Sequence, residues 1–150
     1  MEFITKNFGE TQQLAQRLID KVIKMPHDGA LVLALKGDLG VGKTTFIQGL
    51  GVALDIKEKI LSPTFVIMKH FNILSSGFFS DFYHLDCYRI ESSDDLEILN
   101  FKEIISEPKN LVVIEWAERI KKALPLDTVW LEFEHGGEDK RIIRILNFKI

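Results

Sequence analysis

A phosphate-binding pattern is the strongest chemical feature of the sequence. It has the form G-x-x-x-x-G-K-[ST] and reads Gly37-Asp38-Leu39-Gly40-Val41-Gly42-Lys43-Thr44. Its glycines let the backbone fold tightly, so that successive N–H groups can face an anion without an intervening Cβ. Lys43 would place an ammonium on the β- and γ-phosphates, and Thr44 would offer its hydroxyl to Mg²⁺. The pattern therefore predicts a nucleotide site.

Two acidic residues at the ends of expected strands are candidates to complete a Mg²⁺ site. Glu115 follows the apolar run 111–114, and Asp86 follows the less apolar run 82–85. A carboxylate after a buried strand is the usual metal partner of such a loop. We expect both residues to serve the site, and Glu115 has the stronger case.

The base that the site prefers is predicted from a missing pattern. GTP-binding proteins usually identify guanine with N/T-K-x-D, and the segment Thr5-Lys6-Asn7-Phe8 lacks the aspartate. No other segment of the sequence matches. ATP is therefore the expected nucleotide.

The elements needed to position these residues follow an α/β pattern. Apolar residues at helical spacing predict a helix over 11–23, with Thr11 as its N-cap, and a second helix after the phosphate loop. Continuous apolar runs at 30–35 and 111–114 predict strands that are covered on both faces. Segments 65–71 and 78–88 are expected to pair as an antiparallel hairpin, and 128–134 and 141–148 are strand-like. We predict a three-layer sandwich of the P-loop NTPase type, with a mostly parallel central sheet and some antiparallel strands.

Composition sets the broad class of protein. The chain has 150 residues, of which 46% are hydrophobic and 27% charged, so we expect one globular domain over 1–150. A net charge of -3 argues against autonomous binding to nucleic acid. A single cysteine, Cys87, excludes an intramolecular disulfide and a cysteine-based zinc cluster. The absence of a membrane-length apolar run or a signal pattern makes a cytoplasmic protein the expectation.

Four motifs taken together resemble the TsaE (YjeE) family, small bacterial ATPases of tRNA threonylcarbamoyladenosine synthesis. They are the phosphate loop continued through Thr45-Phe46, then Ser62-Pro63-Thr64-Phe65, His84-Leu85-Asp86-Cys87-Tyr88-Arg89 and Ile114-Glu115-Trp116. The resemblance extends over almost the whole chain. The phosphate loop alone is generic, whereas the order and spacing of the four motifs are specific.

The resemblance implies roles for individual residues. The loop through Thr45 would bind the phosphates of ATP, Thr44 and Glu115 would bind Mg²⁺, and Thr64 would sense the γ-phosphate. Asp86 matches an acid that bears on hydrolysis, and Trp116 matches a tryptophan near the nucleotide. The segment from Phe8 to Thr11 would touch the base. His84 has no companions at metal-ligand spacing, so we expect it to pack or to form hydrogen bonds.

The resemblance also implies how the protein acts. Family members work with the partners TsaB and TsaD, and TsaD transfers the threonylcarbamoyl group. The chain would use ATP to reset that complex, and it would meet tRNA only through its partners. Lys43, Asp86 and Glu115 would carry catalysis, and either acid could orient the attacking water. Arg89 is a candidate arginine finger in cis. Two alternatives stay open, a small-molecule kinase of the P-loop type and a nucleotide sensor without meaningful turnover.

Overall fold

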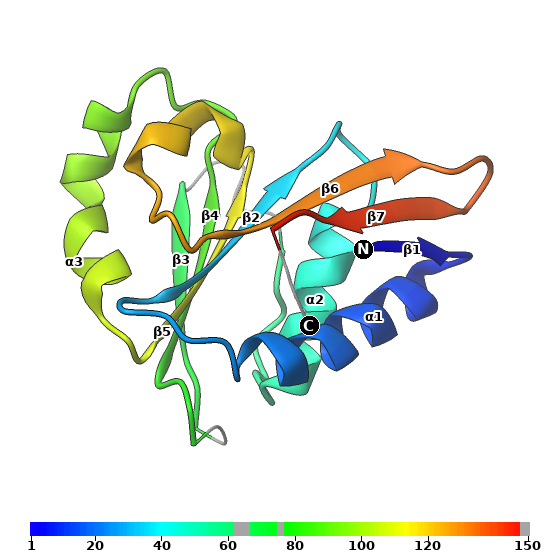
Figure 1. Ribbon diagram of the computed structural model, residues 1–150, viewed down its shortest axis with the longest axis horizontal. Coiled ribbons are helices and arrows are strands. Elements are labelled where there is room, and N and C mark those ends of the chain that lie inside the picture. Colours follow the sequence, from blue (N-terminus) through cyan, green and yellow to red (C-terminus); the bar gives the residue numbers. More distant parts are fainter. Residues whose placement is uncertain (62–66, 75–76, 148–150) are drawn as a thin grey trace.

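The computed structural model describes residues 1–61, 67–74 and 77–147, which form a seven-stranded mixed sheet flanked by helices (Figure 1). The strands are β1 (Glu2–Thr5), β2 (Leu31–Lys36), β3 (Met68–Asn72), β4 (Asp81–Asp86), β5 (Asn110–Glu115), β6 (Val129–His135) and β7 (Arg141–Ile145). The helices are α1 (Phe8–Val22), α2 (Lys43–Ala53), α3 (Phe101–Ser106) and the 3₁₀ helices η1 (Ser93–Leu99) and η2 (Ala117–Ala123).

The strand order is β1-β7-β6-β2-β5-β4-β3. The four central strands, β6, β2, β5 and β4, run parallel, while β3, β7 and β1 add antiparallel pairs at the two sides. The predicted α/β class, with a mostly parallel centre and some antiparallel strands, is therefore confirmed. The predicted hairpin is the β3–β4 pair, although residues 65 and 66 at the predicted start of its first strand lie outside the described residues. Strand β7 ends at Ile145, earlier than predicted.

The central strands are apolar because both of their faces are covered. All six residues of β5 are buried, as are the first five of β2. In register, Glu115 pairs with Leu35 on one side and with Asp86 on the other. The carboxyl ends of these strands therefore meet at one edge of the sheet, where the phosphate loop leaves β2.

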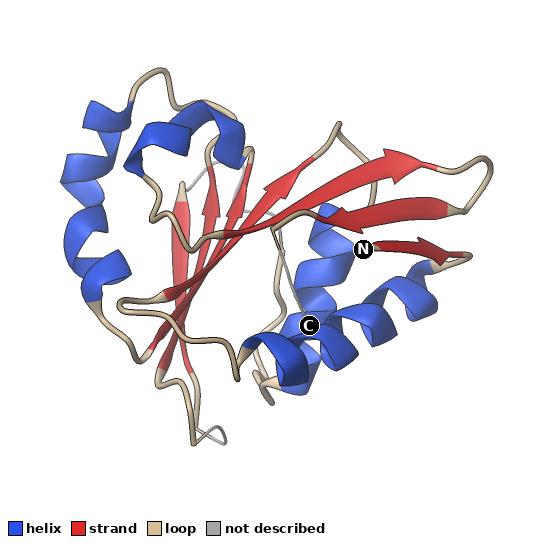
Figure 2. Ribbon diagram, viewed as in Figure 1, coloured by secondary structure: helices blue, strands red, loops and turns tan. Residues whose placement is uncertain are grey.

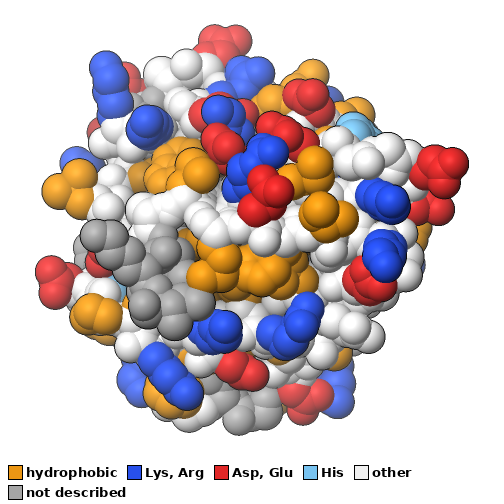
Figure 3. All heavy atoms as spheres, turned by 45° about the vertical axis from the view of Figure 1, so that its right-hand side comes forward, with side chains coloured by type: hydrophobic (Ala, Val, Ile, Leu, Met, Phe, Trp, Pro, Cys, Tyr) orange, Lys and Arg blue, Asp and Glu red, His pale blue; other side chains and the backbone are white. Residues whose placement is uncertain are grey.

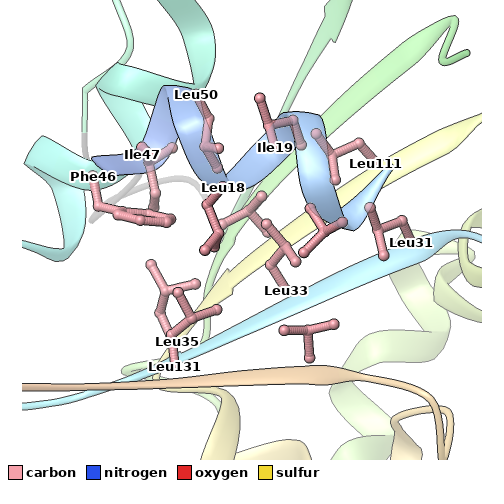
Figure 4. Close-up of a cluster of buried hydrophobic side chains, with 14 of the residues drawn as sticks. Leu18, Ile19, Leu31, Leu33, Leu35, Phe46, Ile47, Leu50, Leu111 and Leu131 are labelled. Carbon is pink, nitrogen blue, oxygen red and sulfur yellow. The ribbon is translucent and has the colours of Figure 1, made fainter. Parts of the chain in front are cut away.

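Two helical layers cover the sheet (Figure 2). Helices α1 and α2 lie over one face, and Leu18, Ile19, Phe46, Ile47 and Leu50 point from them toward Leu33, Leu35 and Leu131 of the strands (Figure 4). The other face packs against η1, α3 and η2 through a second cluster that includes Leu96, Phe101 and Ile120. Each fully buried leucine or isoleucine stabilises the fold by about 1.5–3 kcal/mol relative to its exposed state.

Helix α1 begins at Phe8, three residues before the predicted start at Thr11. Asn7 is its N-cap, with extended backbone and a side-chain oxygen that accepts from the backbone N–H of Glu10 at 2.9 Å. Glu10 accepts in turn from the backbone N–H of Lys6 at 2.7 Å. The prediction of Thr11 as the N-cap was wrong, because Asn7 already satisfies the first turn.

Helices α1 and α2 approach closely at Gly49. A Cβ at this position would lie 2.5 Å from the carbonyl oxygen of Gln12 and 2.7 Å from its Cα. The two helices can therefore pack backbone to backbone only because residue 49 has no side chain.

The surface carries both signs of charge. On the face shown in Figure 3, Lys and Arg side chains are interleaved with Asp and Glu, and hydrophobic side chains gather in patches between them. Among the described residues, the helices are all too short or too polar to cross a membrane.

Candidate functional site

A cavity of about 610 Å³ opens at the edge of the sheet where the carboxyl ends of the central strands meet. It is lined by the phosphate loop, by the ends of β4 and β5, by the start of α1 and by the start of β7. The lining residues are Phe8, Leu39, Gly40, Gly42, Lys43, Thr44, Thr45, Asp86, Tyr88, Glu115, Trp116 and Arg141. Parts of the chain distant in sequence are thus brought together around one hollow of a size that suits a nucleotide.

The phosphate loop has the backbone that an anion site needs. Gly37, with φ 152°, has no space for a Cβ, which would lie 2.6 Å from the carbonyl oxygen of Phe133. Gly42, with φ 100°, is the residue before α2, so that helix begins at Lys43 directly under the loop. The N–H groups at a helix start, with the positive end of its dipole, attract phosphate. Val41 is buried and anchors the loop in the core.

Lys43 lines the cavity and is buried. Its ammonium donates to the carbonyl oxygen of Gly37 and lies 4.2 Å from the centre of the Trp116 ring. Burial lowers the pKa of Lys43 from its ordinary value, and the negative charges of Glu115, Glu118 and Asp86 oppose that shift. A phosphate entering the cavity would add more negative charge around the ammonium.

Thr44 and Glu115 bring two oxygen atoms of the type that Mg²⁺ prefers to one point. The Thr44 hydroxyl donates to Oε1 of Glu115 at 3.4 Å, a long hydrogen bond that leaves both oxygens weakly engaged. Glu115 is itself only 4% exposed. Magnesium is commonly held by one or two protein oxygens together with phosphate and water. The two side chains fit such a role, and the described residues hold no larger group of His, Cys, Asp and Glu side chains that could bind a metal.

Asp86 stands beside Glu115 on the neighbouring strand. It is 8% exposed, and its Oδ1 accepts from the backbone N–H of Tyr88 at 2.9 Å. The parallel register of β4 and β5 explains the adjacency, because it pairs Asp86 with Glu115. The two strand-end acids singled out from the sequence therefore face the same cavity.

An aromatic pair closes the cavity next to the acids. The Tyr88 and Trp116 rings are 5.1 Å apart, and the Arg119 guanidinium lies 5.5 Å from the first and 5.9 Å from the second. Trp116 has φ 56°, a left-handed backbone that is uncommon for a bulky residue. This turn after β5 directs the ring over Lys43.

Comparison with known proteins identifies the group to which this chain is related. The sequence profile of the family described as "Threonylcarbamoyl adenosine biosynthesis protein TsaE" matches residues 5–143. The chain belongs to the TsaE family. The family resemblance drawn from the four motifs is thus confirmed, and it connects the chain with the biosynthesis of this tRNA modification.

Relatives within the TsaE family cover most of the chain. A Bacillus subtilis protein named tRNA threonylcarbamoyladenosine biosynthesis protein TsaE is 35% identical over 143 residues, which are 95% of this chain and 83% of the relative. The Aquifex aeolicus protein of the same name is 31% identical and covers 97% of this chain and 98% of its own. The crystal structure of Bacillus subtilis YdiB superposes with a TM-score of 0.72 at 28% identity, over 97% of this chain and 83% of that one.

The structure places the predicted TsaE site residues in three ways. Most of them line the cavity directly. Gly37, Asp38 and Val41 support the loop without lining the cavity, and Asp38 is exposed. Thr11 is buried and shares a 2.7 Å hydrogen bond with Thr5, while Phe8, from the same predicted base-contacting segment, lines the cavity. Thr64 lies outside the described residues. A base contact of Thr11 and a γ-phosphate contact of Thr64 stay predictions.

Two lining residues, Tyr88 and Arg141, were not assigned a site role from the sequence. Arg141 starts β7, and its guanidinium donates to the carbonyl oxygens of Lys140 at 2.9 Å and of Gly40 at 3.4 Å. Its aliphatic stem covers Gly42. Arg89, the proposed cis arginine finger, is exposed and is not among the lining residues. The sequence pattern at Arg141, a turn followed by a strand, carries no local signal of a site role, because its position depends on how β6 and β7 pair.

Proposed function

We infer that the protein binds ATP with Mg²⁺ and hydrolyses it slowly, as a cytoplasmic accessory protein of tRNA threonylcarbamoyladenosine modification that works with TsaB and TsaD. The observation that carries this proposal is the meeting of Thr44 and Glu115, 3.4 Å apart, beside the Lys43 ammonium in a cavity of about 610 Å³. Membership of the TsaE family supports the pathway, and the partner names rest on the motif resemblance. Contact with tRNA would be made by the partners.

Binding of the triphosphate rests on the loop and on Lys43. The ammonium now donates to the Gly37 carbonyl, and it would exchange this partner for phosphate oxygens when ATP enters. The exchange is favourable because the phosphate oxygens carry negative charge, whereas the Gly37 carbonyl is a neutral acceptor. The first N–H groups of α2, which begins at Lys43, would add further donors to the phosphates.

Thr44 and Glu115 would hold Mg²⁺. A cation held by these two side chains would offset negative charge on the phosphates. Glu115 contributes a formal negative charge and Thr44 a neutral oxygen, which suits a cation that keeps several of its waters. Because Glu115 is buried, solvent screens this attraction weakly.

The remaining step is the attack of water on the γ-phosphoryl group. Asp86 lines the cavity and lies beside Glu115, so either carboxylate could orient that water. Arg89 does not line the cavity, whereas Arg141 lines it while bonded to the loop backbone. A partner could supply a further cation in trans, and turnover by the isolated chain would then be slow.

Steady-state phosphate release tests the metal-dependent part of the proposal. Glu115→Gln should raise the Mg²⁺ concentration needed for half-maximal turnover, while ATP binding in EDTA stays within about twofold. Glu134→Gln is the matched control, because Glu134 lies on β6 in an ion pair with Arg144 outside the cavity. Unchanged Mg²⁺ dependence in Glu115→Gln would refute its role as a ligand.

Co-purification with TsaB and TsaD tests the partner part. Association should require ATP and Mg²⁺, and turnover should rise when both partners are present. Full-rate hydrolysis by the isolated chain would contradict the proposal. Transfer of phosphate to small acceptors would favour the kinase alternative, and nucleotide binding without release under any condition would favour the sensor.

A further inference from the structure

His84 is a fully buried polar residue next to the proposed metal site. It lies in the middle of β4, and its side chain is 0% exposed. Its Nε2 is 2.8 Å from Oε2 of Glu115. A carboxylate can only accept, so Nε2 carries the proton and donates it. The carboxylate of Glu115, the proposed metal ligand, thus accepts a hydrogen bond from the buried imidazole of His84.

The sheet register explains this contact. His84 pairs with Val113, and Asp86 pairs with Glu115 on the same two parallel strands. Side chains two residues apart on a strand share a face of the sheet. His84 therefore lies on the same face as Asp86, and diagonally across from Glu115 on the neighbouring strand. Both partners are rigid parts of the core, which leaves the imidazole little freedom to turn.

The two carboxylate oxygens of Glu115 have different hydrogen-bond partners. Oε2 is engaged by His84, while Oε1 faces the Thr44 hydroxyl at 3.4 Å. Asp86, in contrast, is held by the backbone N–H of Tyr88, which no side-chain substitution at residue 88 removes. Glu115 has a side-chain donor, His84, whose hydrogen bond can be removed by substitution.

We propose that His84 is a positioning residue, whose Nε2–H fixes the Glu115 carboxylate so that Oε1 is presented beside Thr44 for Mg²⁺. The inference rests on the proposed Mg²⁺–ATP function. Loss of a hydrogen bond that orients a metal ligand commonly weakens metal binding by 10- to 100-fold. His84 would act on metal affinity through Glu115 and would leave metal-free nucleotide binding alone.

A pair of variants tests the inference by nucleotide binding, followed through tryptophan fluorescence. His84→Leu removes the donor at similar volume. His84→Gln restores it, because the glutamine amide nitrogen is separated from Cβ by the same number of bonds as Nε2. We expect the Mg²⁺ concentration that gives half-maximal strengthening of ADP binding to rise about tenfold or more in His84→Leu. ADP affinity in EDTA should stay within about twofold, and His84→Gln should recover most of the Mg²⁺ response.

A double-substitution cycle separates positioning from a general effect on the fold. In a Glu115→Gln background, His84→Leu should have no further effect on the Mg²⁺ response, because the residue through which it acts is already changed. Equal losses in EDTA and in Mg²⁺, or an undiminished effect in that background, would overturn the inference. So would a His84→Leu protein with the Mg²⁺ response of the unsubstituted chain.

Nitrogen-15 NMR of histidine-labelled protein gives a second measurement, made on the unsubstituted chain. The Nε2 resonance of His84, assigned by its loss in His84→Gln, should shift when Mg²⁺ is added to the ADP-bound protein. A resonance that ignores Mg²⁺ while the metal strengthens ADP binding would overturn the role of His84 alone. If Mg²⁺ leaves ADP binding of the unsubstituted chain unchanged, the proposed function fails and this inference fails with it.

Discussion

The two sides of the cavity are built in different ways. One side, the strand-end wall, consists of Asp86, Glu115 and Trp116 at the ends of the parallel strands β4 and β5. The other side, the hairpin wall, consists of Phe8 at the start of α1 and Arg141 at the start of β7. Glu115 is 4% exposed, whereas Phe8 is 69% exposed. The two acids are therefore buried at the ends of core strands, Trp116 and Arg141 are half-buried, and Phe8 is exposed at the rim of the cavity.

The difference extends to how each wall holds its side chains. Glu115 is bonded to His84 and Thr44, and Asp86 to the Tyr88 backbone, so the strand-end wall is fixed by hydrogen bonds within the core. Arg141 is bonded to carbonyl oxygens of a loop and a turn. Substitutions in the strand-end wall should therefore affect chemistry, and those in the hairpin wall should affect binding by smaller amounts.

Lys43→Ala, between the two walls, should have the largest effect. Removing the ammonium deletes the main positive side chain facing the phosphates, and we expect turnover to fall by about 100-fold or more. Phosphate release and ATP binding would measure this loss. Lys36→Ala is the control, because Lys36 is paired with Glu132 and does not line the cavity. Equal effects of both substitutions would show that only general charge matters.

Asp86→Asn tests the strand-end wall itself. The asparagine oxygen can still accept from the Tyr88 N–H, so this hydrogen bond is kept while the negative charge is lost. If Asp86 orients the attacking water, turnover should fall by about 100-fold with ATP binding nearly unchanged. Asp81→Asn provides the comparison at the other end of β4, where Asp81 is bonded to His70. A loss of binding equal to the loss of turnover would contradict a role in chemistry.

Arg141→Ala tests the hairpin wall. Loss of a half-buried cation that contacts the loop backbone should weaken nucleotide affinity by about tenfold, which is about 1.4 kcal/mol. Isothermal titration with ADP would measure it. Arg144→Ala is the matched control, since Arg144 lies on the same strand but is paired with Glu2 and Glu134. A drop in turnover at saturating ATP, without a drop in affinity, would mean that the two walls do not divide binding and chemistry.

Cys87 tests how rigid the strand-end wall is, with the smallest expected effect. The thiol is fully buried next to Asp86, and burial raises its pKa to about 12. The reactive thiolate is then scarce at pH 8, and access is blocked as well. A thiol reagent should leave the native protein unlabelled over an hour and label it promptly in denaturant. Rapid native labelling would reveal frequent opening of this wall.

The sequence predicted the strand-end wall better than the hairpin wall. Glu115 and Asp86 could be found because a carboxylate after an apolar run is a local pattern, and parallel packing brings such ends together. Trp116 came from the family motif. The buried His84 was expected to form hydrogen bonds, and it does, although its partner depended on a register between β4 and β5 that spacing alone does not define.

Arg141 could not be placed in the same way. Its position depends on three pairings: β6 lies parallel to β2, β7 folds back on β6, and His135 is opposite Arg141. These bring the start of β7 to the edge where β2 ends. Thr11 was predicted wrongly for a different reason. Threonine is a good N-cap in general, but Asn7 lies earlier in the sequence and caps the helix instead.

The missing side chain at Gly49 has a consequence for the ligand as well as for the helices. Nearly two turns along α2 from Lys43, it locks that helix against Gln12 of α1, whose first residue is Phe8. The Gly49–Gln12 contact therefore connects the helix that follows the phosphate loop with the helix that carries Phe8 of the hairpin wall. The distance between the loop and Phe8 then depends on a helix contact remote from the opening of the cavity. A residue of any other type at position 49 would push the two helices apart and change that distance, although residue 49 does not line the cavity.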